Sequence, residues 1–268
     1  MKRMLLNITI SLVLVLGFSL LPAMATFQLE VNPQVIDLGT PGDLAAAAGY
    51  AILAKAGVST VPTSTVIGNV GTSPIARGAL TGWSITFDVT DTYGESVQVA
   101  APYKLYAADL VGGTTTSDLG LAVGVMETAY TDGAGRIPSS PATTNVGAGT
   151  LTNLTLSRGV YEWGSALNIP TDLTLSGSAT DVWIFKVAGT LTMAANKSVI
   201  MAGGALPENV FWVVSGAVTF GASTHFEGVI LGKTGITLGN LASINGRLLA
   251  QTRVNLSMNT INSLPAEI

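Results

Sequence analysis

The segment Thr234-Gly235-Ile236-Thr237 recurs in degenerate form along the second half of the chain, and its spacing indicates the fold. A repeat of roughly 18 residues, built from β-branched residues and glycine, is typical of one coil of a parallel β-solenoid. Because side chains alternate along a strand, the Leu, Val or Ile of each copy faces the core and the Thr beside it faces water. We therefore predict a mostly β protein, a solenoid with one face of stacked threonines. The apolar members of the copies are Leu154, Leu173, Leu191, Val218, Ile236 and Val254, evenly spaced except for a longer step between Leu191 and Val218.

The same pattern appears near the start of the chain. Ile52–Ser59 matches Ile230–Thr237 position by position, and Leu248–Asn255 continues the register. Coils with matching strands can stack on one another. We therefore expect early coils, at about residues 37–100, to dock beside late coils, at about residues 146–262, within one domain.

One segment between the two groups of coils has helical periodicity. Its apolar residues recur at spacings of three and four, which predicts an amphipathic helix over about residues 117–132. Thr116-Ser117 can cap its start, and Gly133 and Gly135 are expected to end it. We expect this helix to cover strands that are apolar on both sides, such as Val182–Phe185 and Val210–Val214. The apolar positions of the helix are Leu121, Ala122, Val125, Met126, Ala129 and Tyr130.

Residues 1–25 have the pattern of a secretory signal peptide. Lys2 and Arg3 precede an apolar run from Met4 to Leu20, and the small-residue site Ala23-Met24-Ala25 follows at once. A membrane anchor is the alternative, because the run approaches spanning length. The sequence therefore predicts an extracellular protein with one mature domain, residues 26–268, and no membrane contact after cleavage.

The composition restricts the partners of the protein. With 12 Lys and Arg against 16 Asp and Glu, the chain has a net charge of −4, which disfavours nucleic acid as a partner. No cysteine is present, so an exported chain must rely on burial and hydrogen bonds rather than on disulfides. Only 10% of residues are charged, so uncharged small residues must cover much of the surface.

The residues needed for catalysis or metal binding do not cluster in the sequence. Asp181, Glu208 and Glu227 fall on different strand columns, and His225 is the only histidine. Polysaccharide-degrading β-helices need carboxylates within reach of each other, and metal sites need several His, Cys or acidic ligands. We therefore expect no enzyme activity, no metal and no cofactor.

Six segments carry a family resemblance, and together they span about residues 37–262. They are Tyr50–Ala54, Gly68–Pro74, Met126–Asp132 with Gly135-Arg136, Val182–Phe185, Asn209–Trp212 and Gly246–Gln251. In these segments the chain resembles the β-solenoid ice-binding proteins that cold-adapted bacteria, algae and fungi secrete. The resemblance implies a discontinuous β-helix of triangular section, with a long helix along one side and a flat exposed side that adsorbs to ice.

The resemblance also implies which residues make the flat side. In this family the flat side carries small residues in the pattern Thr-(Ala/Gly)-x-(Thr/Asn), which Thr234–Thr237 matches in full. The pattern places Thr190, Thr192, Ala217, Thr219, Thr234, Gly235 and Thr237 at the centre of the ice-binding face, with Ala56, Ser59, Thr252 and Asn255 extending it.

Three residues interrupt the pattern. Arg253 occupies a position where Ala or Gly is usual. If the repeat is followed back along the chain, Asp172 and Asn153 fall in the same row and also interrupt it. Long or charged groups would lift part of the face off a crystal plane. The sequence therefore places the working patch on the middle coils and the N-terminal strand.

Ice is therefore the expected partner, bound by a monomer, with thermal hysteresis and inhibition of ice recrystallisation as the results. The alternative is a secreted β-helix adhesin or polysaccharide-active protein, in which exposed tryptophans would stack on sugars. Trp183 and Trp212 lie in the apolar strand column and are expected in the core instead.

Overall fold

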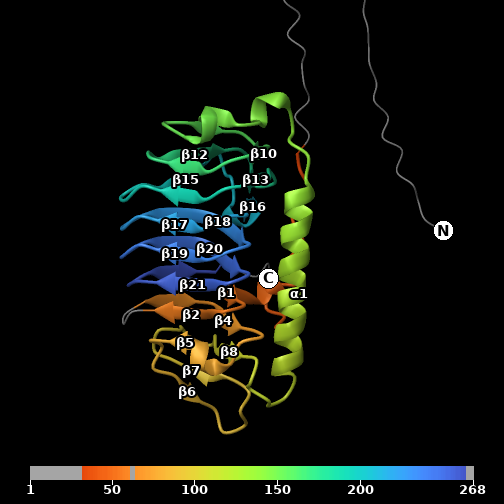
Figure 1. Ribbon diagram of the computed structural model, residues 1–268, viewed down its shortest axis with the longest axis vertical. Helices are drawn as coiled ribbons and strands as arrows, with labels where there is room; N and C mark the ends of the chain where they lie inside the picture. The colour runs from red at the N-terminus through yellow and green to blue at the C-terminus, as the bar shows by residue number, and fades with distance from the viewer. Residues whose placement is uncertain (1–31, 61–63, 264–268) are drawn as a thin grey trace, which may run out of the picture.

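The computed structural model describes residues 32–60 and 64–263, and the signal peptide predicted for residues 1–25 lies outside them. The described chain winds into stacked coils that form three sheets, with one helix along the stack (Figure 1). Successive strands of a coil lie on different faces, which gives the solenoid three faces. The predicted parallel β-solenoid with a helix packed alongside is confirmed.

The first sheet has twelve strands and lies partly under the helix. Its strands are parallel, except that β7 pairs with β6 and β8 in antiparallel fashion. The strands are β10 (Gly159–Trp163), β13 (Trp183–Val187), β16 (Val210–Val214), β18 (His225–Gly232), β20 (Ser243–Ala250), β1 (Tyr50–Ala54), β4 (Asn69–Thr72), β8 (Leu105–Ala107), β7 (Gly94–Glu95) and β6 (Thr86–Phe87), with β22 (Thr260–Asn262) and β3 (Thr65–Ile67) attached through β20.

The second and third sheets form the other two faces. The second contains β11 (Leu167–Ile169), β14 (Leu191–Met193), β17 (Val218–Phe220), β19 (Ile236–Leu238), β21 (Arg253–Leu256), β2 (Gly57–Thr60) and β5 (Leu80–Thr81). The third contains β15 (Val199–Ala202), β12 (Leu173–Ser176) and β9 (Thr155–Leu156). Short 3-10 helices at Ala47–Gly49, Arg77–Ala79, Pro141–Thr143, Val146–Gly149 and Pro207–Asn209 connect strands.

The early and late parts of the chain meet inside the stack. β1, β2 and β3 pair in parallel with β20, β21 and β22, so the first coil sits directly on the last one. Ile52 lies opposite Leu248 and Ser59 lies opposite Asn255, as the sequence match requires. The predicted docking of early coils beside late coils is therefore confirmed.

Strands β18 and β20 each run over two faces and bend at a glycine. Gly228 and Gly246 have φ values of 109° and 158° and lie opposite each other. A Cβ on Gly246 would come within 1.8 Å of the Gly228 carbonyl oxygen. Only glycine fits this corner, because it allows both the positive φ and the close approach of the two main chains.

The interior of the solenoid is a continuous apolar column with aromatic rings at its centre. Phe185 stacks on Trp212 at a centroid distance of 4.1 Å, and Phe226 lies 4.9 Å from Trp212 and 4.2 Å from Phe220. Such ring pairs add to the free energy gained by burying their area. Trp183 and Trp212 are fully buried, as predicted, and so are Trp83 and Trp163.

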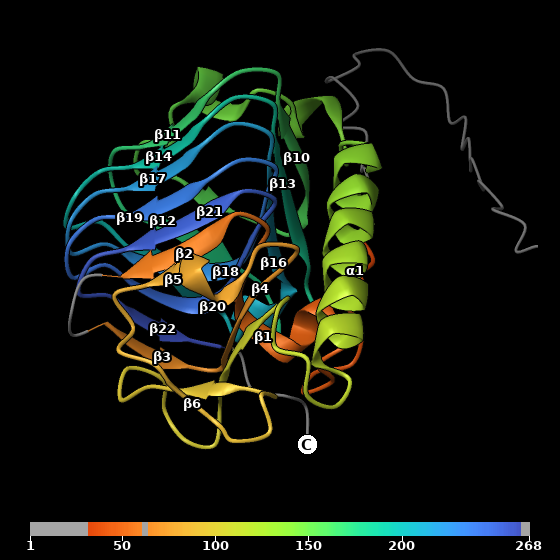
Figure 2. The ribbon, with the colours of Figure 1, turned by 60° about the horizontal axis from the view of Figure 1, so that its bottom comes forward.

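The helix α1 (Thr115–Gly135) covers the outer surface of the first sheet (Figures 1 and 2). Its residues Ala122, Met126 and Ala129 are buried against strand residues such as Ile184 and Leu231. This confirms the predicted cover of a column that is apolar on both sides. The Tyr130 hydroxyl also forms a hydrogen bond of 2.9 Å with the Ser215 hydroxyl, which fixes the helix to the corner after β16.

The details of the helix differ from the sequence-based expectation. Leu121 is 60% exposed, whereas Leu119 and Val123 are buried, because the buried face is rotated from the one that the apolar spacing indicated. The helix begins after Thr114, not after Ser117. It continues through Gly133 and ends at Gly135, the second of the two glycines expected to stop it. A Cβ on Gly133 would lie 2.6 Å from Val213 Cγ2, so Gly133 allows close packing and does not end the helix.

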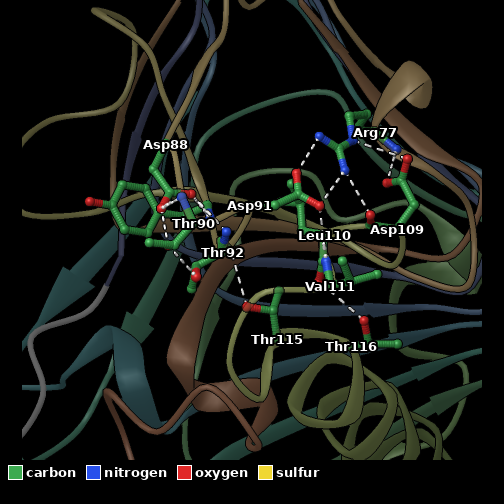
Figure 3. A network of polar contacts seen from close by, with 11 residues as sticks. Arg77, Asp88, Thr90, Asp91, Thr92, Asp109, Leu110, Val111, Thr115 and Thr116 are labelled. Carbon is green, nitrogen blue, oxygen red and sulfur yellow. Dashed lines mark hydrogen bonds and ion pairs between the residues drawn. The ribbon is translucent and has the colours of Figure 1, made fainter.

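Separate segments cover the two open ends of the solenoid. At one end, Arg77 binds Asp91 (Nη1 to Oδ1, 2.7 Å) and Asp109 (Nε to Oδ2, 3.0 Å), as Figure 3 shows. Its guanidinium also lies 4.7 Å from the centre of the Phe87 ring. These contacts fix the loops at that end. At the other end, Trp163 Nε1 donates to the Val146 carbonyl oxygen at 2.8 Å. Terminal covers of this kind are needed because a repeat stack exposes apolar surface at both ends.

The packing at Gly133 gives a test of the fold. We expect Gly133→Ala to lower the free energy of unfolding by about 1 kcal/mol, because overpacking against Val213 outweighs the higher helix propensity of alanine. Gly124→Ala is the matched control, since a Cβ at Gly124 meets nothing within 4 Å. This control should raise stability by about 0.5–1 kcal/mol. Urea unfolding of both variants is the measurement, and equal gains in both would contradict the packing described.

Candidate functional site

The second sheet forms one exposed face of the molecule. Its seven strands are parallel and in register, and Leu191, Val218 and Ile236 lie opposite one another with their side chains in the core. The helix α1 lies along the first sheet, and no helix of the described chain covers this second sheet (Figure 2). We call this second sheet, from β11 to β5, the flat sheet.

One row of polar side chains runs along the outside of the flat sheet. Each member follows an inward apolar residue by one position, so alternation turns it outward. Thr192, Thr219 and Thr237 lie opposite each other on adjacent strands, and the last two are exposed. The ladder of threonines expected from the repeat is confirmed for these three coils. In strand order the outer row is Asn168, Thr192, Thr219, Thr237, Asn255, Ser59 and Thr81.

A second row lies two positions before the outer row, at or just before the start of each strand. It consists mainly of small residues, and Thr190 and Ala217 in it are exposed. Gly235 leaves the main chain open just before β19, and Arg253 is the exception in size and charge. In strand order the inner row is Ala166, Thr190, Ala217, Gly235, Arg253, Gly57 and Ala79.

Three of the residues expected in the face lie at its corner. Thr234, Thr252 and Ala56 precede the inner row by one position, where the chain turns from the first sheet to the flat sheet. Ala56 is exposed and Thr252 is half-buried. Thr234 is also half-buried, and its Oγ1 is enclosed with no hydrogen-bond partner among the described residues. The hydroxyl of Thr234 is therefore unlike those of Thr219 and Thr237, because it does not reach the surface.

Hydrogen bonds between side chains connect neighbouring strands of the flat sheet. Ser59 Oγ donates to Asn255 Oδ1 at 2.8 Å, and Asn255 Nδ2 donates to Thr237 Oγ1 at 3.3 Å. Thr192 Oγ1 donates to Asn168 Oδ1 at 3.1 Å. Because threonine also has few χ1 rotamers, these bonds hold the row in fixed positions.

The sequence ladder was wrong in its first two members. Thr155 and Thr174 face each other on β9 and β12, which belong to the third sheet. Asp172 lies just before β12, where its Oδ1 accepts from Ser198 N at 2.9 Å, so neither Asp172 nor Asn153 interrupts the flat sheet. These two segments still have a spacing close to the repeat length. The reason is that the chain passes from one face of the solenoid to another between them and the later copies of the pattern.

The true neighbours of Thr192 on that side belong to β11. Leu167 pairs with Leu191 and Asn168 pairs with Thr192. The coil that separates these paired residues is longer than the repeat. A search with a fixed period therefore could not identify Asn168 as the neighbour of Thr192. The alternation in Leu167-Asn168-Ile169 was the available signal, and Thr81 on β5 was missed for the same reason.

The third face carries a separate polar cluster around the only histidine. His225 Nε2 lies 2.8 Å from Glu227 Oε1, and His225 Nδ1 lies 2.8 Å from Ser243 Oγ. Asn245 Nδ2 donates to the same Glu227 oxygen at 3.1 Å. Glu227 is buried, so its charge needs these partners. The hydrogen bond to Glu227 outweighs partial burial and raises the pKa of His225 above its ordinary 6.5.

The acidic residues Asp181 and Glu227, weighed above as catalytic candidates, lie in separate ion pairs. Asp181 pairs with Arg158 at 2.9 Å, and Glu227 lies in the histidine cluster. Within the described ranges, no group of three or more His, Cys, Asp or Glu side chains comes close enough to hold a metal ion. The described part of the chain also contains no helix with the length and apolarity to cross a membrane.

This fold and this flat sheet define a helix-flanked β-solenoid with one exposed threonine face. The chain belongs to the ice-binding-like family, whose model matches residues 52–262. It is 48% identical over 221 residues to an ice-binding protein of Flavobacterium frigoris, covering 82% of this chain and 75% of that protein. It is 42% identical over 221 residues to an ice-binding protein of a Leucosporidium species, covering 82% of this chain and 83% of that protein.

Solved structures agree with this assignment. An ice-binding protein from an Arctic yeast superposes with a TM-score of 0.79 at 42% identity, over 87% of this chain and 97% of that one. An ice-binding protein domain from Shewanella frigidimarina superposes with a TM-score of 0.76 at 25% identity, over 88% of this chain and all of that one. The resemblance drawn from the six sequence segments is therefore confirmed.

The histidine cluster predicts a pH dependence of stability. Since the folded-state pKa of His225 is raised, its contribution is fully present below about pH 6.5 and is lost as pH rises through the raised value. The unaltered protein should lose thermal stability between about pH 5.5 and about pH 9 as His225 loses its proton. In His225→Gln this contribution to the loss should be absent. Melting temperatures of both proteins across this range are the measurement. An identical pH profile in the variant would show that the cluster does not titrate in this way.

Proposed function

We propose that this protein is secreted as a monomer and adsorbs to ice through the part of the flat sheet that carries Thr192, Thr219 and Thr237. The observation that carries the proposal is the in-register row Thr192, Thr219 and Thr237, on strands that no described helix covers. Adsorbed molecules would curve the ice front between them, which lowers the freezing point and blocks recrystallisation. Family membership supports ice as the ligand, because the relatives described above are named ice-binding proteins.

The geometry of the flat sheet suits a crystalline ligand. Adjacent strands are about 4.8 Å apart, and alternate residues on a strand are about 6.6 Å apart. These spacings lie near the repeat distances of oxygens in ice, so the hydroxyl and methyl groups can hold surface water in an ice-like arrangement. The methyl groups favour release of disordered water, and the hydroxyl groups anchor the ordered remainder.

The rigidity of the face is as necessary as its spacing. A flexible side chain would lose rotamer entropy on binding and would move the water it holds. The threonines are β-branched, and Asn255 links Thr237 to Ser59 through hydrogen bonds. Many weak contacts can therefore form together without a large cost of ordering.

An adhesin or polysaccharide-active protein is less consistent with the structure. Stacking on sugars needs exposed aromatic faces, and Trp83, Trp163, Trp183 and Trp212 are each 0% exposed. The acidic residues Asp181 and Glu227 are engaged in separate pairs. A reducing-sugar assay on pectin-like polymers is expected to show no turnover.

The proposal predicts that a large ring on the threonine row abolishes activity. We expect Thr219→Tyr to reduce thermal hysteresis by roughly tenfold or more. The ring would keep the neighbouring side chains of the row away from the crystal, and the contacts of those side chains act together. Thr237→Tyr should behave alike. Thr237 serves better than Thr234 as the second position, since the Thr234 hydroxyl is enclosed at the corner.

Thr155→Tyr is the matched control, because Thr155 is an exposed strand threonine on the third sheet. It should leave thermal hysteresis and ice-crystal shape unchanged. Circular dichroism and melting temperature establish that all three variants are folded. Full activity in folded Thr219→Tyr and Thr237→Tyr would refute the assignment of the flat sheet as the ice-binding face.

A further inference from the structure

Arg253 stands in the interior of the flat sheet, not at its edge. Its strand β21 lies between β19 and β2, with four strands of the sheet on one side and two on the other. The side chain is exposed and points outward, since Val254 beside it is fully buried. Among the outer-row and inner-row positions defined above, Arg253 carries the only charge.

The neighbours of Arg253 leave it room to lie across the sheet. Gly57 is opposite it on β2, and Gly235 is in the matching position before β19. A Cβ on Gly235 would lie 3.6 Å from Arg253 Cγ, so the arginine stem occupies the space next to Gly235. Within residues 32–60 and 64–263, the guanidinium has no hydrogen-bond or ion-pair partner. Its charge is therefore satisfied by solvent.

On the far side of Arg253 the surface is hollow. A depression of about 210 Å³ lies over Gly57, between Arg253 on β21 and Ala79 and Thr81 on or beside β5. Elsewhere the inner row, with Thr190, Ala217 and Gly235, runs along the sheet as a row of small residues. The depression is the continuation of that row, separated from it by one long side chain.

We propose that Arg253 divides the flat sheet and confines ice contact to β11, β14, β17 and β19. This inference rests on the function proposed above. β2 and β5 carry Ser59 and Thr81 in register with the threonine row, but Arg253 on β21 lies between these two strands and the rest of the sheet. Arg253 thus sets how much of the sheet contacts the crystal and how strongly the protein adsorbs.

The physical reason is the hydration of a mobile cation. A guanidinium has five N–H donors and no acceptor, so the waters around it cannot take the balanced donor and acceptor positions of an ice lattice. The side chain also has many rotamers, which a bound crystal plane would have to fix. A flat plane that meets the threonine row on β14, β17 and β19 therefore cannot also settle on β2 and β5.

The first test replaces the cation. In Arg253→Ala the inner row becomes small from Ala166 to Ala79, so we expect thermal hysteresis at equal concentration to rise on the order of twofold, as more contacts act together. Arg253→Lys keeps a mobile charge and is the matched control, with activity close to that of the unaltered protein. An unchanged or lower activity in folded Arg253→Ala overturns the inference, and a loss would show that Arg253 itself contacts ice.

The second test asks whether the far strands become part of the face. Thr81 is exposed on β5, so Thr81→Tyr should have little effect in the unaltered protein, because β5 is outside the contact. In the Arg253→Ala background, Thr81→Tyr should cancel the gain in thermal hysteresis. Equal effects of Thr81→Tyr in both backgrounds would show that Arg253 does not divide the sheet.

Thr219→Tyr, measured in the same assay, separates the two proposals. If it abolishes activity while Arg253→Ala gives no gain, the flat sheet binds ice and only the inference about Arg253 fails. If Thr219→Tyr retains activity, the proposed face itself is wrong. Melting temperatures should be unaltered in the Arg253 variants, since that side chain has no partner within the described ranges.

Discussion

Parallel, in-register stacking of the coils holds the whole molecule together. Main-chain hydrogen bonds between coils, such as that from Val218 N to the Gly235 carbonyl oxygen at 3.0 Å, place each strand directly over the next. Buried residues such as Val218 and Ile236 fix the register, because a slip of one residue would expose all of them. The same register then aligns Thr219 and Thr237 on the outside. The order of the proposed ice-binding face is thus a consequence of how the core packs.

The three faces of the solenoid differ because different segments cover them. The first sheet is apolar on its outer side as well, and α1 buries residues such as Ile184. The third face carries polar side chains, including the cluster around His225. The flat sheet carries short, mainly uncharged side chains on its outer side, and no helix of the described residues covers it. Lys55 at its corner is paired with Glu127 on the helix, whereas Arg253 lies solvated within the sheet, and this difference gives Arg253 its proposed effect on adsorption.

Residue pairing between coils can be predicted from the sequence only where successive coils have the same length. The coils from Val218 to Ile236 and from Ile236 to Val254 are equal in length, so periodicity alone paired the residues of the outer row on them correctly. Periodicity gave the wrong pairing for the longer coils. Thr155, for example, has the right local pattern but belongs to the third sheet. Spacing also misplaced the end of the helix, because it does not show that Gly133 packs against the first sheet.

Alternation and β-branched residues act within a strand, so the sequence alone was enough to specify a parallel β-solenoid with one helix and a threonine row. Matching registers in Ile52–Ser59 and Leu248–Asn255 were likewise enough to join the first coil to the last. The folded arrangement was needed to establish which strands share the flat sheet, where Arg253 stands in it and why the Thr234 hydroxyl is enclosed. Those properties arise from contacts between neighbouring coils, which no local pattern encodes.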